Sequence, residues 1–264
     1  MKRTICAAVA VLVVAAPAWA DLKMTQVVSG KGMGMSGNTP GVTYIKGMKM
    51  RTDSISGDTT RTMIFDVAAQ KMYSFDDKRK EADVWDMADV GKQIDANVDT
   101  SQMTASLKAT GQSKQVAGGL TATGYEMNAS MPMTMGDPKS GMRMTVNLTG
   151  PVWIVKGAPG TADYLRFYEA AVERGFIFGD PRAAKGAGGQ MKTMAEMYRQ
   201  FIETGGLPYE IEMNVRLSGD GPMAGMMAKM GGMTTTTVIR TVETAPLPDD
   251  LFGPPAGYKL NARK

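Results

Sequence analysis

The chain has 264 residues, of which 43% are hydrophobic and 21% are charged, a balance typical of a globular protein. It contains 25 methionines, a single cysteine (Cys6) and no histidine. The missing histidine excludes Ser-His-Asp and Cys-His catalysis, histidine metal sites and histidine proton relays. We therefore expect a non-enzymatic protein without a resident cofactor.

The first twenty residues have the features of a secretory signal peptide. Two basic residues precede an apolar run over residues 5–16, which is too short to span a bilayer comfortably. Ala18-Trp19-Ala20 then gives a small-x-small cleavage signal, with Asp21 as the new N-terminus. Cleavage leaves residues 21–264 as a single periplasmic domain with 28 basic and 26 acidic residues. The resulting net positive charge is small, which argues against a nucleic-acid partner.

The first half of this domain is predicted to consist of β-strands. Alternating apolar and polar residues between turn residues indicate strands over residues 22–29, 42–53, 59–66, 71–75 and 81–87. We expect a glycine- and methionine-rich loop over residues 30–41, and a long connection or frayed helix over residues 89–103. The loop contains a G-x-G-x-x-G match. A strand follows it instead of the helix that a nucleotide site needs, so no nucleotide site is predicted.

The second half mixes strands with two helices. Strands are predicted over residues 104–111, 120–135, 142–148, 152–156, 209–217 and 233–243, with an irregular tail over residues 254–258. Gly150-Pro151 is expected to break the chain, because a proline in a strand requires an edge or a bulge. Apolar residues at helical spacing predict helices over residues 162–174 and 190–203. This order indicates an α+β fold with one sheet and helices on one face.

Three segments together resemble a known family. They are the strand over residues 42–53, the hairpin-like stretch from Met63 to Phe75, and Pro248-Asp-Asp-Leu-Phe252 followed by Pro255-Ala-Gly-Tyr-Lys259. They are similar to an uncharacterised bacterial periplasmic family related to the lipoprotein carriers LolA and LolB. The resemblance implies a strongly curved antiparallel sheet, an incomplete barrel, with helices on the concave face and a cavity for acyl chains. Arg51 is the only arginine placed like the buried arginine of those carriers.

Many of the methionines occur in M-x-M units, which place two thioethers on one face of a strand. If residues 136–141 form a hairpin loop, Met135 lies opposite Met142, and Met133 lies opposite Met144. A second group, from Met223 onward, has methionines at i, i+3, i+4 and i+7 between several glycines. Because glycine weakens helices, we expect this second segment to be a mobile flap that covers a cavity mouth or touches a membrane transiently.

Three functions are compatible with these patterns. The preferred one is a binding protein that holds a hydrophobic or lipidic ligand in a half-barrel cavity, because methionine adapts to varied apolar partners. The expected ligand-binding residues are Met131, Met133, Met135, Met142, Met144, Tyr164, Tyr168, Met194, Tyr198 and Phe201. The alternative is Cu(I) binding by the thioethers of Met133, Met135, Met142 and Met144. The third is a structural or partner-binding envelope module, in which methionine fills the core or consumes oxidants.

Overall fold

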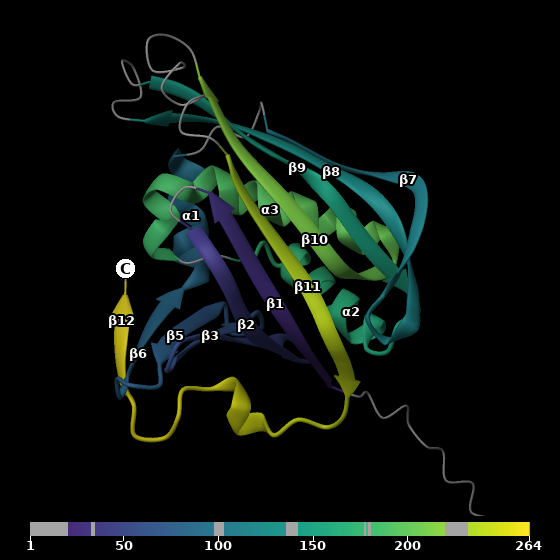
Figure 1. Ribbon diagram of the computed structural model, residues 1–264. Helices are drawn as coiled ribbons and strands as arrows, with labels where there is room; N and C mark the ends of the chain where they lie inside the picture. Colours follow the sequence, from purple (N-terminus) through teal and green to yellow (C-terminus); the bar gives the residue numbers. More distant parts are fainter. Residues whose placement is uncertain are drawn as a thin grey trace, which may run out of the picture.

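One open sheet of twelve strands makes up most of the described chain (Figure 1). The computed structural model describes residues 21–32, 35–97, 103–135, 142–176, 178, 181–219 and 232–263. The strand order is β12-β6-β5-β4-β3-β2-β1-β11-β10-β9-β8-β7. Neighbouring strands are antiparallel except β12 and β6, which are parallel.

The strands vary from five to 16 residues in length. In chain order they are β1 (Leu22–Gly32), β2 (Met35–Lys46), β3 (Lys49–Ser56), β4 (Thr59–Asp66), β5 (Lys71–Asp76), β6 (Glu81–Asp86), β7 (Thr104–Val116), β8 (Leu120–Met135), β9 (Met142–Lys156), β10 (Gly206–Gly219), β11 (Met233–Thr244) and β12 (Lys259–Arg263). The helices are α1 (Met87–Asn97), α2 (Thr161–Glu173) and α3 (Ala184–Thr204), with short 3-10 turns η1 (Ala117–Gly119), η2 (Pro181–Ala183) and η3 (Asp249–Phe252).

The strand predictions located most of the sheet but misplaced several ends. The predicted strand over residues 42–53 is a hairpin, because the chain turns at Gly47, whose φ of 54° favours glycine. The predicted loop over residues 30–41 lies largely within β1 and β2, which pair up to Gly32 and Met35. The sequence pattern does not predict this extension, because it depends on hydrogen bonds to neighbouring strands.

Gly150-Pro151 does not break the chain into two strands, contrary to the prediction. It lies inside β9, which pairs with β8 on one side and β10 on the other. The ladder to β10 has no assigned pair between Val152 and Thr149, next to the position where proline cannot donate a hydrogen bond. An interior strand therefore accommodates the proline by giving up pairing on one side.

Helices α2 and α3 each bury a stripe of apolar residues. In α2 the buried stripe includes Tyr164, Phe167 and Tyr168, at the i, i+3, i+4 spacing of one helix face. Gly160 precedes this helix with a φ of 73°, and a side chain there would collide with Leu22 of β1. Helix α2 packs against β2 and β10, and α3 packs against β7, β8 and β10. The two predicted helices are confirmed, although α3 begins six residues earlier than expected.

Two apolar cores lie between the helices and the sheet. The larger one, which we call the aromatic core, draws residues from β1–β6, β8–β11, α1 and α2, and contains, among others, Phe65, Trp85, Phe167, Tyr168, Phe176, Phe178 and Tyr209. The smaller one, the methionine core, joins β7–β11 to α3. Its buried residues are Met127, Ala129, Met131, Leu148, Val152, Ile154, Met197, Phe201 and Val215.

The C-terminal segment covers the opposite side of the sheet. Side chains alternate between the two faces of β4, so Ile64 points away from the face of Met63 and Phe65. It packs there with Phe75 and Ala82, and Tyr258 of the C-terminal segment lies against this cluster. Arg51 lies on this same side. Its Nη1 donates to the Leu251 carbonyl at 3.1 Å, and its Nε pairs with Asp53 at 2.9 Å. The arginine singled out by the family resemblance therefore fastens the C-terminal segment.

The predicted fold class is wrong. The described chain is mostly β, its sheet is mixed rather than antiparallel, and its edges β12 and β7 do not pair to close a barrel. The described residues contain three α-helices, and they do not form a layer that clearly covers a concave face. The mixed character comes from the C-terminal strand β12, for which the sequence analysis makes no prediction. Residues 259–263 become a strand because they satisfy the free backbone groups along the edge of β6.

Candidate functional site

Three of the predicted aromatic residues meet where α2 and α3 lie against each other. The ring centres of Tyr164 and Tyr168 are 4.6 Å apart, and Tyr198 stacks on Tyr168, also at 4.6 Å. The Phe201 ring lies 6.3 Å from that of Tyr198. Tyr198 packs against both cores, so this aromatic contact joins the two cores.

The tyrosine cluster is held in its neutral form. Burial raises the pKa of Tyr198 to about 12 and holds the pKa values of Tyr164 and Tyr168 well above their usual range, since an apolar surrounding disfavours a phenolate. Repulsion from neighbouring tyrosines adds to the rise in the pKa of Tyr168. Its hydroxyl donates to Met50 Sδ at 3.8 Å. These phenols are suited to packing and hydrogen bonding, and not to general base catalysis at neutral pH.

The methionine core contains two of the three predicted methionines whose side chains are described. Met131 is buried in it, and Met194 packs at its edge together with Tyr198. Met144 is also buried, at 4% exposure, farther along β9. The partly buried rim of this core consists of Met103, Ala105, Leu107, Tyr125, Val146, Met194, Tyr198, Ile211, Met213 and Met233. The structure therefore brings Met131 and Met194 together with the predicted aromatic residues along α3, but it does not bring Met144 into either core.

The predicted methionine hairpin has the expected register. Met133 of β8 lies opposite Met144 of β9, and Met135 lies opposite Met142. The side chains of Met133, Met135 and Met142, and the proposed hairpin loop, lie outside the described part of the structure. The segment predicted to be a flap also lies outside it, up to the start of β11. The pairing of the backbone is confirmed, while binding of a ligand or copper there remains a prediction.

Sequence reasoning missed two buried methionines at the centre of this site, Met197 and Met127. Met197 is fully buried at the middle of α3, and Met127 is almost as buried on β8. Met197 falls three residues after Met194 and four before Phe201, so the helical spacing already placed it on the buried face. Met127 does not belong to an M-x-M unit, so that pattern does not identify it.

One buried polar atom in this region has no partner. Thr193 is 1% exposed, and its Oγ1 makes no hydrogen bond with any described residue. Thr193 precedes Met197 by one helical turn, which places both residues on the face of α3 that the sheet covers. A buried hydroxyl without a partner costs about 1–3 kcal/mol, so this position departs from ordinary core packing.

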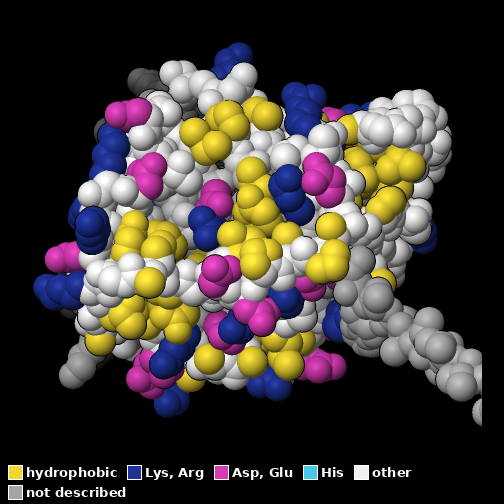
Figure 2. All heavy atoms as spheres, turned by 90° about the horizontal axis from the view of Figure 1, so that it is seen from below, with side chains coloured by type: hydrophobic (Ala, Val, Ile, Leu, Met, Phe, Trp, Pro, Cys, Tyr) yellow, Lys and Arg dark blue, Asp and Glu magenta, His cyan; other side chains and the backbone are white. Residues whose placement is uncertain are grey.

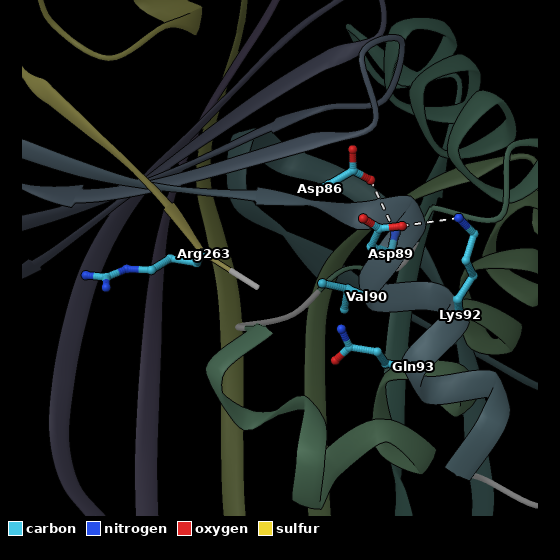
Figure 3. Close-up of a pocket in the computed structure, with 6 residues that line it drawn as sticks. All are labelled: Asp86, Asp89, Val90, Lys92, Gln93 and Arg263. Atoms are coloured by element: carbon cyan, nitrogen blue, oxygen red, sulfur yellow. Dashed lines mark hydrogen bonds and ion pairs between the residues drawn. The ribbon is translucent and has the colours of Figure 1, made fainter.

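Two cavities in the described residues lie outside the methionine core, although Val90 of the aromatic core lines one of them. One, of about 330 Å³, lies beside α1 and is lined in part by Asp89, Lys92 and Arg263 (Figure 3). The Arg263 side chain extends away from the α1 residues in that view, and Asp89 pairs with Lys92 at 3.1 Å. The other cavity, of about 260 Å³, contains several arginines. Neither is lined by a residue that the sequence analysis assigned to ligand binding.

The remaining surface gives no single dominant charge. On the face shown in Figure 2, basic and acidic side chains alternate with hydrophobic ones. The described residues contain no group of three or more carboxylate, cysteine or histidine side chains arranged to hold a metal ion. Within the same residues, no helix has the length and apolar character needed to cross a membrane.

Searches against protein-family models and against curated proteins find no match for this chain.

Proposed function

We propose that this chain is a non-enzymatic periplasmic protein that binds a hydrophobic or lipidic molecule against its methionine core. The observation that carries the proposal is the incomplete burial of that core. Ten of its 19 described residues are only partly buried, compared with nine of the 31 described residues of the aromatic core. Apolar side chains that remain partly exposed gain free energy when an apolar ligand covers them, at about 25 cal/mol per Å².

The residue types support adaptable binding. Methionine supplies seven of the 19 residues of the methionine core and five of the 31 of the aromatic core. The unbranched thioether side chain changes rotamer easily and fits ligands of different shapes. A ligand can enter by displacing these side chains, so the site does not require a permanent cavity. Met213 and Met233 at the rim are the residues that we expect a ligand to meet first.

Thr193 supports a ligand with one polar end. Its buried hydroxyl lacks a partner among the described residues, and an oxygen atom of a ligand would supply one. A fatty acid or another singly polar lipid therefore fits better than a pure hydrocarbon. The proposed location in the periplasm rests on the signal-peptide features of residues 1–20, which lie outside the described residues.

The test is displacement of a fluorescent fatty-acid probe from the purified chain beginning at Asp21. Polar substitution at the rim, Met213→Gln with Met233→Gln, should weaken probe binding about tenfold or more. Met63→Gln is the matched control, because Met63 is a partly buried methionine at the edge of the aromatic core. Equal losses in the rim variant and the control would contradict the proposal, as would the absence of saturable binding by the unmodified chain.

A second experiment tests the polar end of the ligand. Thr193→Val keeps the shape of the side chain and removes the hydroxyl that has no partner. The variant should be more stable than the parent without ligand, and it should bind the fatty-acid probe less tightly. Binding of a hydrocarbon probe without a polar group should stay the same. Unchanged affinity for the fatty-acid probe would remove Thr193 from the site.

Copper binding is a second candidate, favoured by the register that pairs Met133 with Met144 and Met135 with Met142. Thioether sulfur is a soft ligand that suits Cu(I), whereas leucine provides no lone pair. Replacing all four methionines by leucine should leave fatty-acid binding intact, because the volume is nearly conserved. If the parent binds Cu(I) tightly in competition with a chromogenic chelator and the fourfold variant does not, copper is the better account.

A further inference from the structure

A second region of the molecule gathers arginines around a cavity. Arg61 of β4, Arg79 of the turn after β5, Arg182 of η2 and Arg263 of β12 all line the cavity of about 260 Å³, which we call the arginine pocket. Liquid water takes about 30 Å³ per molecule, so this volume holds several waters or one small anion with its hydration. Arg61 and Arg79 come from neighbouring parts of the chain, whereas Arg182 and Arg263 come from distant segments that only the folded structure brings to them.

All four arginines interact with neighbouring groups, and the contacts of three of them are specific. Arg263 donates through Nε and Nη2 to the same oxygen of Asp83, at 2.8 and 2.7 Å. Arg79 Nε lies 3.0 Å from Asp76 Oδ2, and the Arg182 guanidinium lies over the Trp85 ring at 5.6 Å. Each guanidinium carries five N–H groups in a planar fork, which is more than a single contact uses.

The acidic residues of the pocket do not cancel this positive charge. Four arginines face three carboxylates, from Asp76, Glu81 and Asp83. Asp76 Oδ1 also accepts hydrogen bonds from the backbone N–H groups of Lys78 and Arg79. Glu81 accepts from Asn261 and has Lys259 within 3.6 Å. Donors outside the four arginines therefore neutralise part of the acidic charge, which leaves the pocket positive.

The arginine pocket is also lined by Ser74, a buried residue that carries a hydroxyl group. Ser74 of β5 lines the cavity although only 5% of its surface is exposed. Serine hydroxyls and arginine forks are the donors that recognise phosphate oxygens, and a partly enclosed site strengthens such contacts relative to open water.

From this arrangement we propose that the arginine pocket binds a phosphate group, with Arg61 and Arg182 closing on its oxygens and Ser74 donating from the floor. The phosphate belongs to a soluble phosphate ester or to a phospholipid headgroup, since both present the same oxygens. This site is separate from the methionine core, and its test does not depend on the apolar ligand proposed there.

The experiment measures binding of phenyl phosphate to the full chain beginning at Asp21, by calorimetry at constant ionic strength set with potassium chloride. Saturable binding should be weakened at least tenfold in the double variant Arg61→Gln/Arg182→Gln. The matched control is Arg199→Gln/Arg240→Gln, which removes two exposed arginines elsewhere and should bind like the parent. Arg79→Gln and Ser74→Ala provide weaker, independent tests, each with a several-fold loss expected.

The source of the phosphate is decided by sedimentation with phosphatidylcholine vesicles that contain or lack phosphatidic acid. Co-sedimentation that requires phosphatidic acid and is lost in the double variant assigns a lipid headgroup. Binding of phenyl phosphate without co-sedimentation assigns a soluble ester. The proposal is overturned if phenyl phosphate shows no saturable binding, or if the double variant and the control variant bind alike. Circular dichroism of each variant verifies that it is folded before binding is compared.

Discussion

The two cores of this molecule are built from the same sheet but use different side chains. The aromatic core contains ten aromatic and five methionine residues among 31, whereas the methionine core contains three aromatic and seven methionine residues among 19. Aromatic rings interlock in fixed geometries, as between Phe65 and Phe178 at 5.4 Å. Methionines fill space without such constraints. The aromatic core therefore holds the fold in place, and the methionine core can rearrange around a ligand.

The largest effect is expected from Phe167→Ala. Phe167 is fully buried, and its ring contacts those of Tyr168 and Phe178 at 5.2 and 5.7 Å. Removing the ring leaves a cavity that its rigid neighbours cannot fill, so the free energy of unfolding should fall by about 4–5 kcal/mol. Urea denaturation measures this loss. A fall of less than about 2 kcal/mol would show that the aromatic core also relaxes.

Phe201→Ala should cost less, about 3 kcal/mol, because the flexible methionines around Phe201 can move into part of the cavity. Phe201 is 3% exposed and lies on the same helix as the exposed Arg199. Arg199→Ala is the control and should change the stability by no more than about 0.5 kcal/mol, although it removes an ion pair with Glu196. The same denaturation assay applies. Equal effects at Phe201 and Arg199 would contradict the burial of this face of α3.

Alkaline pH should weaken the junction between the two cores. Burial raises the pKa of Tyr198 from 10.0 to about 12, so the unfolded chain loses this proton at lower pH than the folded one. The free energy of unfolding should therefore fall as the pH rises from 10 to about 12. Tyr198→Phe should make this dependence of stability on pH shallower. The pH dependence that remains in the variant is due to Tyr164 and Tyr168, whose pKa values are also raised. Coincident pH profiles of parent and variant, in denaturation titrations, would refute the assignment.

The smallest effect is expected when a methionine is replaced by leucine. Met197→Leu in the methionine core nearly conserves volume and should cost less than about 1.5 kcal/mol. Met50→Leu in the aromatic core should cost about 1 kcal/mol more, since the Tyr168 hydroxyl donates to the Met50 sulfur. Thermal unfolding of the two variants measures the difference. A larger loss for Met197→Leu would mean that its sulfur has a specific partner.

Much of the secondary structure was predictable because its signals are local. The alternation in residues 209–217 identified β10, and the helical spacing of Tyr164 and Tyr168 identified α2. The glycine turn at Ala117–Gly119 located the hairpin of β7 and β8. The pairing of Met133 with Met144 followed from turn chemistry and the two-residue period of a strand. Each of these features depends only on residues close together in the chain.

Only the tertiary structure decided the fold class and the sites. The tail strand β12 forms because β6 offers an open edge, which no pattern in residues 259–263 reveals. Arg51 meets Leu251 across 200 residues of sequence, and the arginine pocket joins Arg61 and Arg79 to the distant Arg182 and Arg263. The sequence by itself determined the absence of histidine chemistry and the abundance of methionine. Which methionines are buried depends on how the strands are ordered in the sheet, because contacts between distant strands are fixed by pairing and packing rather than by local preference.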